Sequence, residues 1–134
     1  MAGYSGRSLV EKLGIKPGTR IAILNAPRGY RVTLGSLPPG VVVASAARGT
    51  FPFIHFFTRS RTLLQAKVPL LLRALAPDGA LWISWPKKAS GVATDMTEDV
   101  VREIALPTGL VDVKVVAVDD IWSGLKLVRR LENR

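Results

Sequence analysis

One apolar run between two polar signals constrains the fold more than any other part of the chain. Residues 80–85 are apolar apart from one serine, follow a turn at residues 77–79, and end abruptly at Lys87 and Lys88. Such a run is typical of a central strand in an α/β sheet whose carboxyl end opens into a ligand-binding crevice. The rest of the chain can be arranged around this strand.

Other short apolar runs predict the remaining strands. Residues 20–25, 41–44 and 51–57 have the length of strands that are buried on both faces of a parallel sheet. Residues 111–118 and 124–129 flank a short turn and predict a terminal antiparallel hairpin. With the central run, these segments predict a sheet of about six strands.

Helical segments separate the strands. Helices are expected at residues 8–13, 27–34 and 59–75, the last with leucines at helical spacing. Asp95, with Glu98 three residues later, has the spacing of a capping box and predicts a fourth helix. The alternation predicts an α/β fold with a doubly wound, mostly parallel sheet that ends in the antiparallel hairpin.

The most aromatic strand is expected to carry different side chains on its two faces. By alternation these are Phe51, Phe53, His55 and Phe57 on one face and Ile54 and Phe56 on the other. His55 lies among phenylalanines, so we expect a hydrogen-bonded core histidine rather than a catalytic base. Trp82 and Trp85 are three residues apart in their own strand and should point to opposite faces.

Composition excludes several kinds of chemistry. The chain has 134 residues, 48% of them hydrophobic, which fits a single domain over residues 1–134. It has no cysteine and one histidine, so we expect no disulfide, no thiol nucleophile and no metal site. No apolar stretch has the length of a membrane span or the pattern of a signal peptide, so a cytoplasmic protein without membrane association is expected.

Charge is unevenly distributed along the chain. The net charge is +9, and residues 1–77 contain eleven Lys or Arg but only one acid, Glu11. Such an excess favours an anionic partner, whether nucleic acid, a nucleotide or a phosphorylated metabolite. A contribution to solubility alone explains the excess equally well.

Two segments resemble class I S-adenosylmethionine-dependent methyltransferases. Residues 15–21, which contain a Pro-Gly pair, look like the entry to the first strand of that fold. Residues 75–83 look like the segment that leads into its fifth strand. The resemblance implies a sheet that ends in an antiparallel hairpin, with one strand–helix unit missing between Ala44 and Phe51.

The resemblance is weakest where that family binds its cofactor. There, an acid and a glycine-rich turn follow the first strand, and a second acid holds the ribose hydroxyls. This chain has Asn25 in place of the first acid, Arg28 where cofactor would pack, and only Ser45 near the second. We therefore expect no cofactor and no enzyme, with S-adenosylmethionine as the alternative. Residues 85–90 and 121–126 look more like a bacterial family catalogued only as a domain of unknown function.

Polar residues that follow the parallel strands define a candidate site. In doubly wound sheets the carboxyl ends of the strands lie along one edge, which is the usual ligand site. Basic residues there would bind an anion, and aromatic residues would stack on a base or ring. The candidate ligand-binding residues are Asn25, Arg28, Tyr30, Arg59, Arg61, Lys87, Lys88, Asp119 and Trp122.

Three classes of function fit these observations. The interpretation we favour is a binding or regulatory module that holds an anionic small molecule or a protein partner in a basic crevice. The first alternative is an S-adenosylmethionine-dependent methyltransferase with an atypical cofactor site. The second is an RNA-binding protein that uses the arginine-rich half of the chain.

Overall fold

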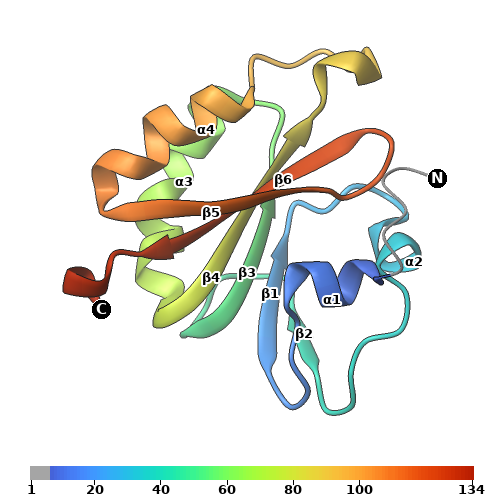
Figure 1. Cartoon of the computed structure of the whole chain (residues 1–134), viewed down its shortest axis with the longest axis vertical. Helices are drawn as coiled ribbons and strands as arrows, with labels where there is room; N and C mark the ends of the chain where they lie inside the picture. Colours follow the sequence, from blue (N-terminus) through green and yellow to red (C-terminus); the bar gives the residue numbers. More distant parts are fainter. Residues whose placement is uncertain (1–6) are drawn as a thin grey trace.

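A six-stranded mixed sheet separates two layers of helices (Figure 1). The computed structural model describes residues 7–134. The strands are β1 (Arg20–Leu24), β2 (Val42–Ala44), β3 (Phe51–Phe57), β4 (Leu75–Pro86), β5 (Leu110–Ala117) and β6 (Trp122–Arg129). The helices are α1 (Leu9–Leu13), α2 (Tyr30–Leu34), α3 (Arg61–Ala74) and α4 (Glu98–Ala105), with 3-10 turns η1 (Lys88–Ser90), η2 (Leu106–Thr108) and η3 (Leu131–Asn133).

The strand order is β2-β1-β3-β4-β6-β5. Strands β1 to β4 pair in parallel, whereas β6 runs antiparallel between β4 and β5. This arrangement confirms the predicted α/β fold, a mostly parallel sheet that ends in an antiparallel hairpin. Strand β2 connects to β3 through residues 45–50 without a helix, at the place where the resemblance implies a missing strand–helix unit.

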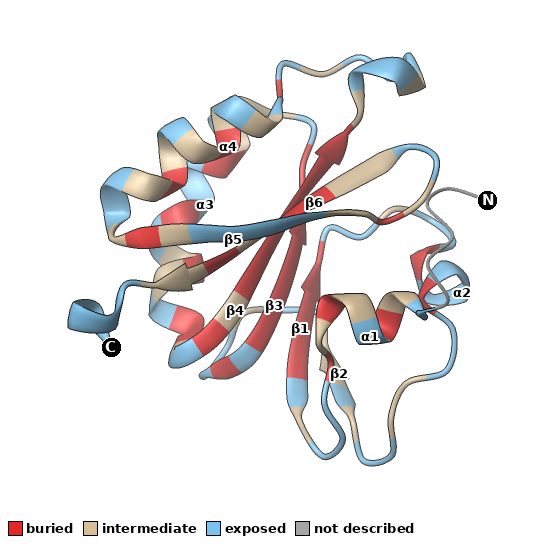
Figure 2. Ribbon diagram, in the orientation of Figure 1, coloured by how far each residue is buried: buried red, intermediate tan, exposed pale blue. Residues whose placement is uncertain are grey.

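Each face of the sheet has its own hydrophobic core. Helices α3 and α4 cover one face, where Leu64 and Leu71 pack against Ile54 and Ile83. Helices α1 and α2 cover the other face, whose core includes Leu13, Tyr30, Phe53, Phe57 and Trp82. The central strands β1, β3 and β4 are therefore buried over most of their length (Figure 2).

Trp82 and Trp85 belong to different cores and are both buried, which confirms that they point to opposite faces. The prediction for Phe51 is wrong, because its side chain packs in the α3 core while Phe53 packs in the other. A shift in the β3–β4 register between these two residues explains the difference. Gly79 lies at this irregularity, where a Cβ atom would stand 3.1 Å from the carbonyl oxygen of Phe51.

The start of α4 also differs from expectation. Thr97, not Asp95, caps α4, since its hydroxyl accepts a hydrogen bond from the Val100 N–H at 3.1 Å. The carboxylate of Asp95 instead accepts from the Arg61 N–H at 2.8 Å and so ties the start of α4 to the start of α3. Among the helices of residues 7–134, none is long and apolar enough to cross a membrane.

Candidate functional site

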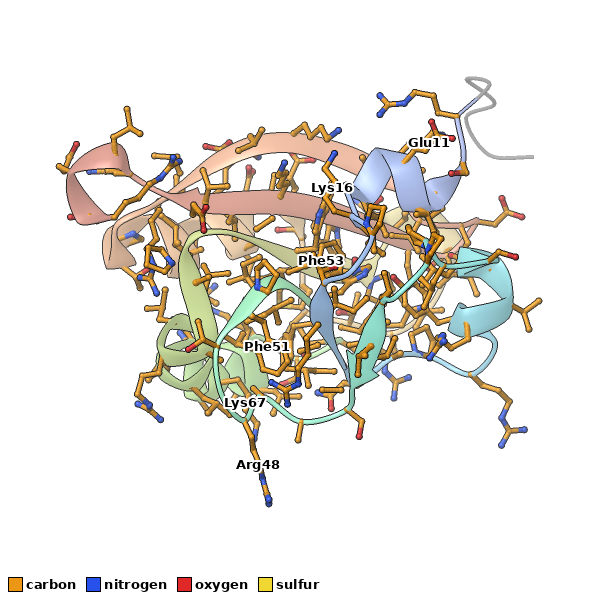
Figure 3. All side chains as sticks on the ribbon, turned by 90° about the horizontal axis from the view of Figure 1, so that it is seen from below. Glu11, Lys16, Arg48, Phe51, Phe53 and Lys67 are labelled. Atoms are coloured by element: carbon orange, nitrogen blue, oxygen red, sulfur yellow. The ribbon has the colours of Figure 1, made fainter. Side chains whose placement is uncertain are left out.

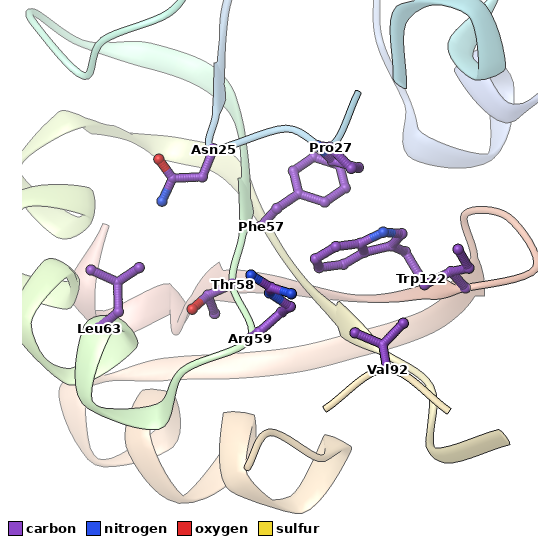
Figure 4. A pocket seen from close by; sticks show the side chains of 9 residues that line it. Asn25, Pro27, Phe57, Thr58, Arg59, Leu63, Val92 and Trp122 are labelled. Carbon is purple, nitrogen blue, oxygen red and sulfur yellow. The ribbon is translucent and has the colours of Figure 1, made fainter. Parts of the chain in front are cut away.

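A pocket opens at the carboxyl edge of the parallel strands, as the sheet topology predicts (Figure 4). We call it the edge pocket; its volume is about 440 Å³. It is bordered by the ends of β1 and β3, the start of α3, the loop before α4 and the start of β6. Its lining residues are Asn25, Pro27, Phe57, Thr58, Arg59, Leu63, Val92, Ile121 and Trp122.

Two aromatic rings form one wall of the edge pocket. The Phe57 and Trp122 rings meet edge to face with their centroids 5.3 Å apart (Figure 4). The carboxylate of Asp119 accepts hydrogen bonds from the N–H groups of Ile121 and Trp122, at 2.8 and 2.7 Å. Asp119, a predicted ligand residue, therefore shapes the β5–β6 turn that presents Trp122 to the pocket.

A buried hydrogen-bonded network lies behind Phe57. The Tyr30 hydroxyl is 2.7 Å from Nδ1 of His55, and the Ser84 hydroxyl is 2.7 Å from Nε2 of the same ring. All three side chains are buried, which confirms His55 as a core histidine. The imidazole stacks on Phe57 with a centroid separation of 4.1 Å. The network thus holds the ring that lines the pocket.

Burial fixes the protonation of this network. It lowers the pKa of His55 to about 3 and raises the pKa of Tyr30 above its usual range, so both are neutral near neutral pH. Tyr30 is only 2% exposed and lies outside the pocket lining. The prediction that Tyr30 is available to stack on a ligand is therefore wrong. Gly29, with φ of 85°, starts α2 in a left-handed turn just before Tyr30, whose ring packs on the sheet.

A second cavity, the side pocket, adjoins the same edge. Its volume is about 210 Å³. Its lining residues are Leu24, Asn25, Ser45, Ala46, Ala47, Phe56, Lys67, Leu70 and Leu71. Asn25 lines both pockets, and in residues 7–134 it alone among non-glycine residues has a left-handed backbone, with φ of 57°. The end of β1 is therefore the wall that the two pockets share.

The predicted basic residues do not converge on one pocket. Only Arg59 lines the edge pocket. Arg61 pairs with Glu103 at 3.0 Å and borders a different groove against α4. Arg28, Lys87 and Lys88 line neither pocket, and the Lys87 N–H instead joins the Ile121 carbonyl at 2.7 Å.

Sequence reasoning missed one cation. Lys67 lines the side pocket from α3 together with Leu70 and Leu71, which follow it at three and four residues and share its helix face. This spacing is visible in the sequence, but the pocket forms only where α3 meets the loop after β2. Among residues 7–134 there is no group of three or more His, Asp or Glu that could hold a metal ion.

Structural comparison shows the same architecture in proteins of low sequence identity. A SAM-dependent methyltransferase from Aquifex aeolicus aligns with a TM-score of 0.62 and 15% identity, over 89% of this chain and 86% of its own. A putative type 11 methyltransferase from Sulfolobus solfataricus gives a TM-score of 0.62 and 14% identity, over 91% and 89%. The chain has a methyltransferase-like fold.

A third similar structure bears on the cofactor. The DhpI–SAH complex aligns with a TM-score of 0.55 and 11% identity, over 82% of this chain and 76% of its own. The expectation of no cofactor is wrong in the light of these neighbours, which include a SAM-dependent methyltransferase and a complex with SAH, S-adenosylhomocysteine. The sequence matches no family model and no curated protein, so the closer resemblance to a bacterial domain of unknown function stays a prediction.

Proposed function

We propose that this chain binds S-adenosylmethionine along the carboxyl edge of its sheet, as a protein of the methyltransferase type. The observation that carries the proposal is the position of Asn25 at the end of β1, in the wall shared by the edge pocket and the side pocket. An elongated ligand that passes Asn25 would reach both cavities. Ligands of doubly wound sheets bind at this edge, and the similar structures are methyltransferases.

The side pocket suits the adenosine part of the cofactor. Leu24, Ala46 and Leu71 provide apolar surface for a purine ring. The hydroxyl of Ser45 and the amide of Asn25 are available to form hydrogen bonds with the ribose hydroxyls. Carboxylates can form such bonds as well. The side pocket therefore offers apolar surface for the base and polar groups for the ribose.

The edge pocket suits the amino acid part. The guanidinium of Arg59 is the group that would hold its carboxylate, since arginine and carboxylate pair through two parallel hydrogen bonds. When bound, S-adenosylmethionine supplies a methyl group attached to a positively charged sulfur. The rings of Phe57 and Trp122 would shield that end from water.

The charges of the two pockets favour the product form of the cofactor. The charged residues that line them in the described chain are Arg59 and Lys67, both cations. S-adenosylmethionine carries a sulfonium charge that S-adenosylhomocysteine lacks, and like charges repel. We therefore expect tighter binding of S-adenosylhomocysteine than of S-adenosylmethionine.

Isothermal titration calorimetry with both ligands tests the proposal. Ala46 is exposed and lines the side pocket, so Ala46→Trp fills the cavity without disturbing the core. We expect this variant to lose at least tenfold in affinity. Ala89→Trp, at an exposed alanine of η1 outside both pockets, is the matched control and should bind like the parent chain. No heat of binding from either ligand at millimolar concentration would contradict the proposal.

A second candidate function rests on the same two cations. Because Arg59 and Lys67 line the pockets and no acid of the described residues does, a regulatory module that holds an anionic nucleotide is favoured as the alternative. Titration with AMP and with adenosine distinguishes the two functions. Binding of AMP at least tenfold tighter than S-adenosylhomocysteine supports the nucleotide module, whereas equal binding of AMP and adenosine argues against it.

A further inference from the structure

Three lysines from separate segments meet on the α1 face of the sheet. Lys114 on β5 lies directly opposite Lys126 on β6, in register. Lys16 follows α1 and lies between that helix and the hairpin (Figure 3). Lys114 and Lys16 are exposed and Lys126 is half-buried.

This arrangement costs stability in the isolated chain. Like charges directly opposite each other on neighbouring strands are unfavourable. Burial, followed by the charges of Lys114 and Lys16, lowers the pKa of Lys126. In residues 7–134, none of the three ammonium groups has an ion pair or a side-chain hydrogen bond. No acid within the described chain compensates their charge, so an anion from outside would relieve the repulsion.

An aromatic side chain continues the same surface towards the edge pocket. On β6, Lys126 is paired with Trp82 of β4, and Trp122 is paired with Pro86 of β4. Because Lys126 and Trp122 are four residues apart on their strand, their side chains lie on the same face of β6. Four residues of strand span about 13 Å. Trp122 is half-buried and lines the edge pocket, whereas Trp82 is buried under α1, to which its indole N–H donates at Leu13.

We propose that this surface, the lysine face, binds single-stranded nucleic acid, with phosphates at Lys16, Lys114 and Lys126 and a base against Trp122. Basic residues that follow the backbone beside an aromatic ring are the usual elements of such sites. A single strand fits better than a duplex, because a duplex keeps its bases stacked and away from the indole ring. The three lysines line neither pocket, and the lysine face shares only Trp122 with the edge pocket. Its binding requires no S-adenosyl ligand.

Fluorescence anisotropy with a labelled 12-nucleotide RNA tests the lysine face in the absence of S-adenosyl ligands. The variant Lys16→Gln/Lys114→Gln/Lys126→Gln should bind at least tenfold more weakly. For single strands, each phosphate contact contributes about 0.7 to the slope of log affinity against log salt, so its magnitude should fall by about 2. The variant should melt no lower than the parent chain, because the substitutions remove repulsion.

A matched control removes three positive charges elsewhere. Arg73 lies on α3 and Arg130 borders a groove at α4, both on the other face of the sheet, and Arg48 points away from the hairpin side (Figure 3). Arg48→Gln/Arg73→Gln/Arg130→Gln should keep most of the affinity. If both triple variants lose the same amount of affinity for the RNA, binding depends only on net charge and the proposal is overturned.

Tryptophan fluorescence locates the base. Trp82 and Trp85 are buried, so Trp122 is the tryptophan that a ligand can reach. Saturating RNA should quench its emission, and absence of quenching would contradict the proposed contact.

Competition with tripolyphosphate, duplex RNA and anionic phospholipid vesicles identifies the source of phosphate. If any of these displaces the labelled strand better than unlabelled single-stranded RNA, the proposal is wrong.

Discussion

The two sides of the Phe57 ring differ in how their polar groups are satisfied. Behind the ring, Tyr30, His55 and Ser84 are buried and bonded to one another. In front of it, the side chains of Asn25 and Arg59 line the edge pocket, and neither has a hydrogen-bonding partner within residues 7–134. Buried polar groups need partners to be stable, whereas groups at a pocket can wait for a ligand. The polar residues behind Phe57 therefore serve the fold, and those in front are free to serve function.

The largest expected effect is on the network behind Phe57. The substitution His55→Ala removes a fully buried ring and leaves the hydroxyls of Tyr30 and Ser84 without their partner. We expect a loss of about 4 kcal/mol in the free energy of unfolding, from the cavity and the unsatisfied groups. Chemical denaturation measures it. A loss below about 1 kcal/mol would show that the network does not stabilise the fold.

The free energy of unfolding should also decrease as the pH falls through a defined range. The pKa of His55 is about 3 in the folded chain, against 6.5 for an ordinary histidine. Between these values the unfolded chain binds one more proton, so stability decreases as the pH falls from 6.5 towards 3. At pH 5 the loss relative to pH 8 is about 2 kcal/mol, since each pH unit contributes about 1.4 kcal/mol. Subtracting the profile of His55→Ala isolates this contribution; identical profiles for the two proteins would contradict it.

A smaller effect is expected from Tyr30→Phe. This change removes one hydroxyl but keeps the ring that packs on Phe57 at 4.7 Å. The Nδ1 atom of His55 loses its partner, which costs about 1 to 2 kcal/mol. Combined with His55→Ala, the two losses should not add, because both remove the same hydrogen bond. Additive losses in a double-mutant cycle would argue against a shared network.

In front of Phe57, Arg59→Gln should change stability by less than about 0.5 kcal/mol, because the side chain is exposed and has no ion pair among residues 7–134. The same change should weaken binding of S-adenosylhomocysteine, whose carboxylate it no longer holds. Arg73→Gln, on the exposed side of α3, is a control for the lost charge. If Arg59→Gln destabilises the fold as much as Tyr30→Phe does, the contrast between the two sides of the ring does not hold.

Much of the fold follows from patterns within single segments. The apolar runs and helical spacings lie within continuous stretches, and their alternation determines the doubly wound sheet. The network depends instead on pairing between distant segments. His55 and Ser84 lie on neighbouring strands, and Tyr30 reaches the imidazole from α2. The wrong prediction of the sheet face for Phe51 also comes from pairing between segments, since a shift in strand register cannot be read from one strand alone.

The candidate site was less predictable than the fold. Topology located the edge, and Asn25, Arg59 and Trp122 lie in the pocket there. Arg61 lies two positions after Arg59, but it begins α3 and turns away to pair with Glu103. Side-chain direction in loops depends on local turns, so the expected convergence of cations did not follow from sequence position.

Backbone and indole NMR of the ¹⁵N-labelled chain, titrated with S-adenosylhomocysteine, tests the central claim most directly. The account predicts that the signals of Asn25, Ser45, Ala46 and Arg59 shift together with the indole N–H of Trp122. The indole N–H of Trp82, bonded to Leu13 behind the core, should stay unchanged. Shifts confined to other surfaces, or none at millimolar ligand, would contradict a cofactor site at the end of β1.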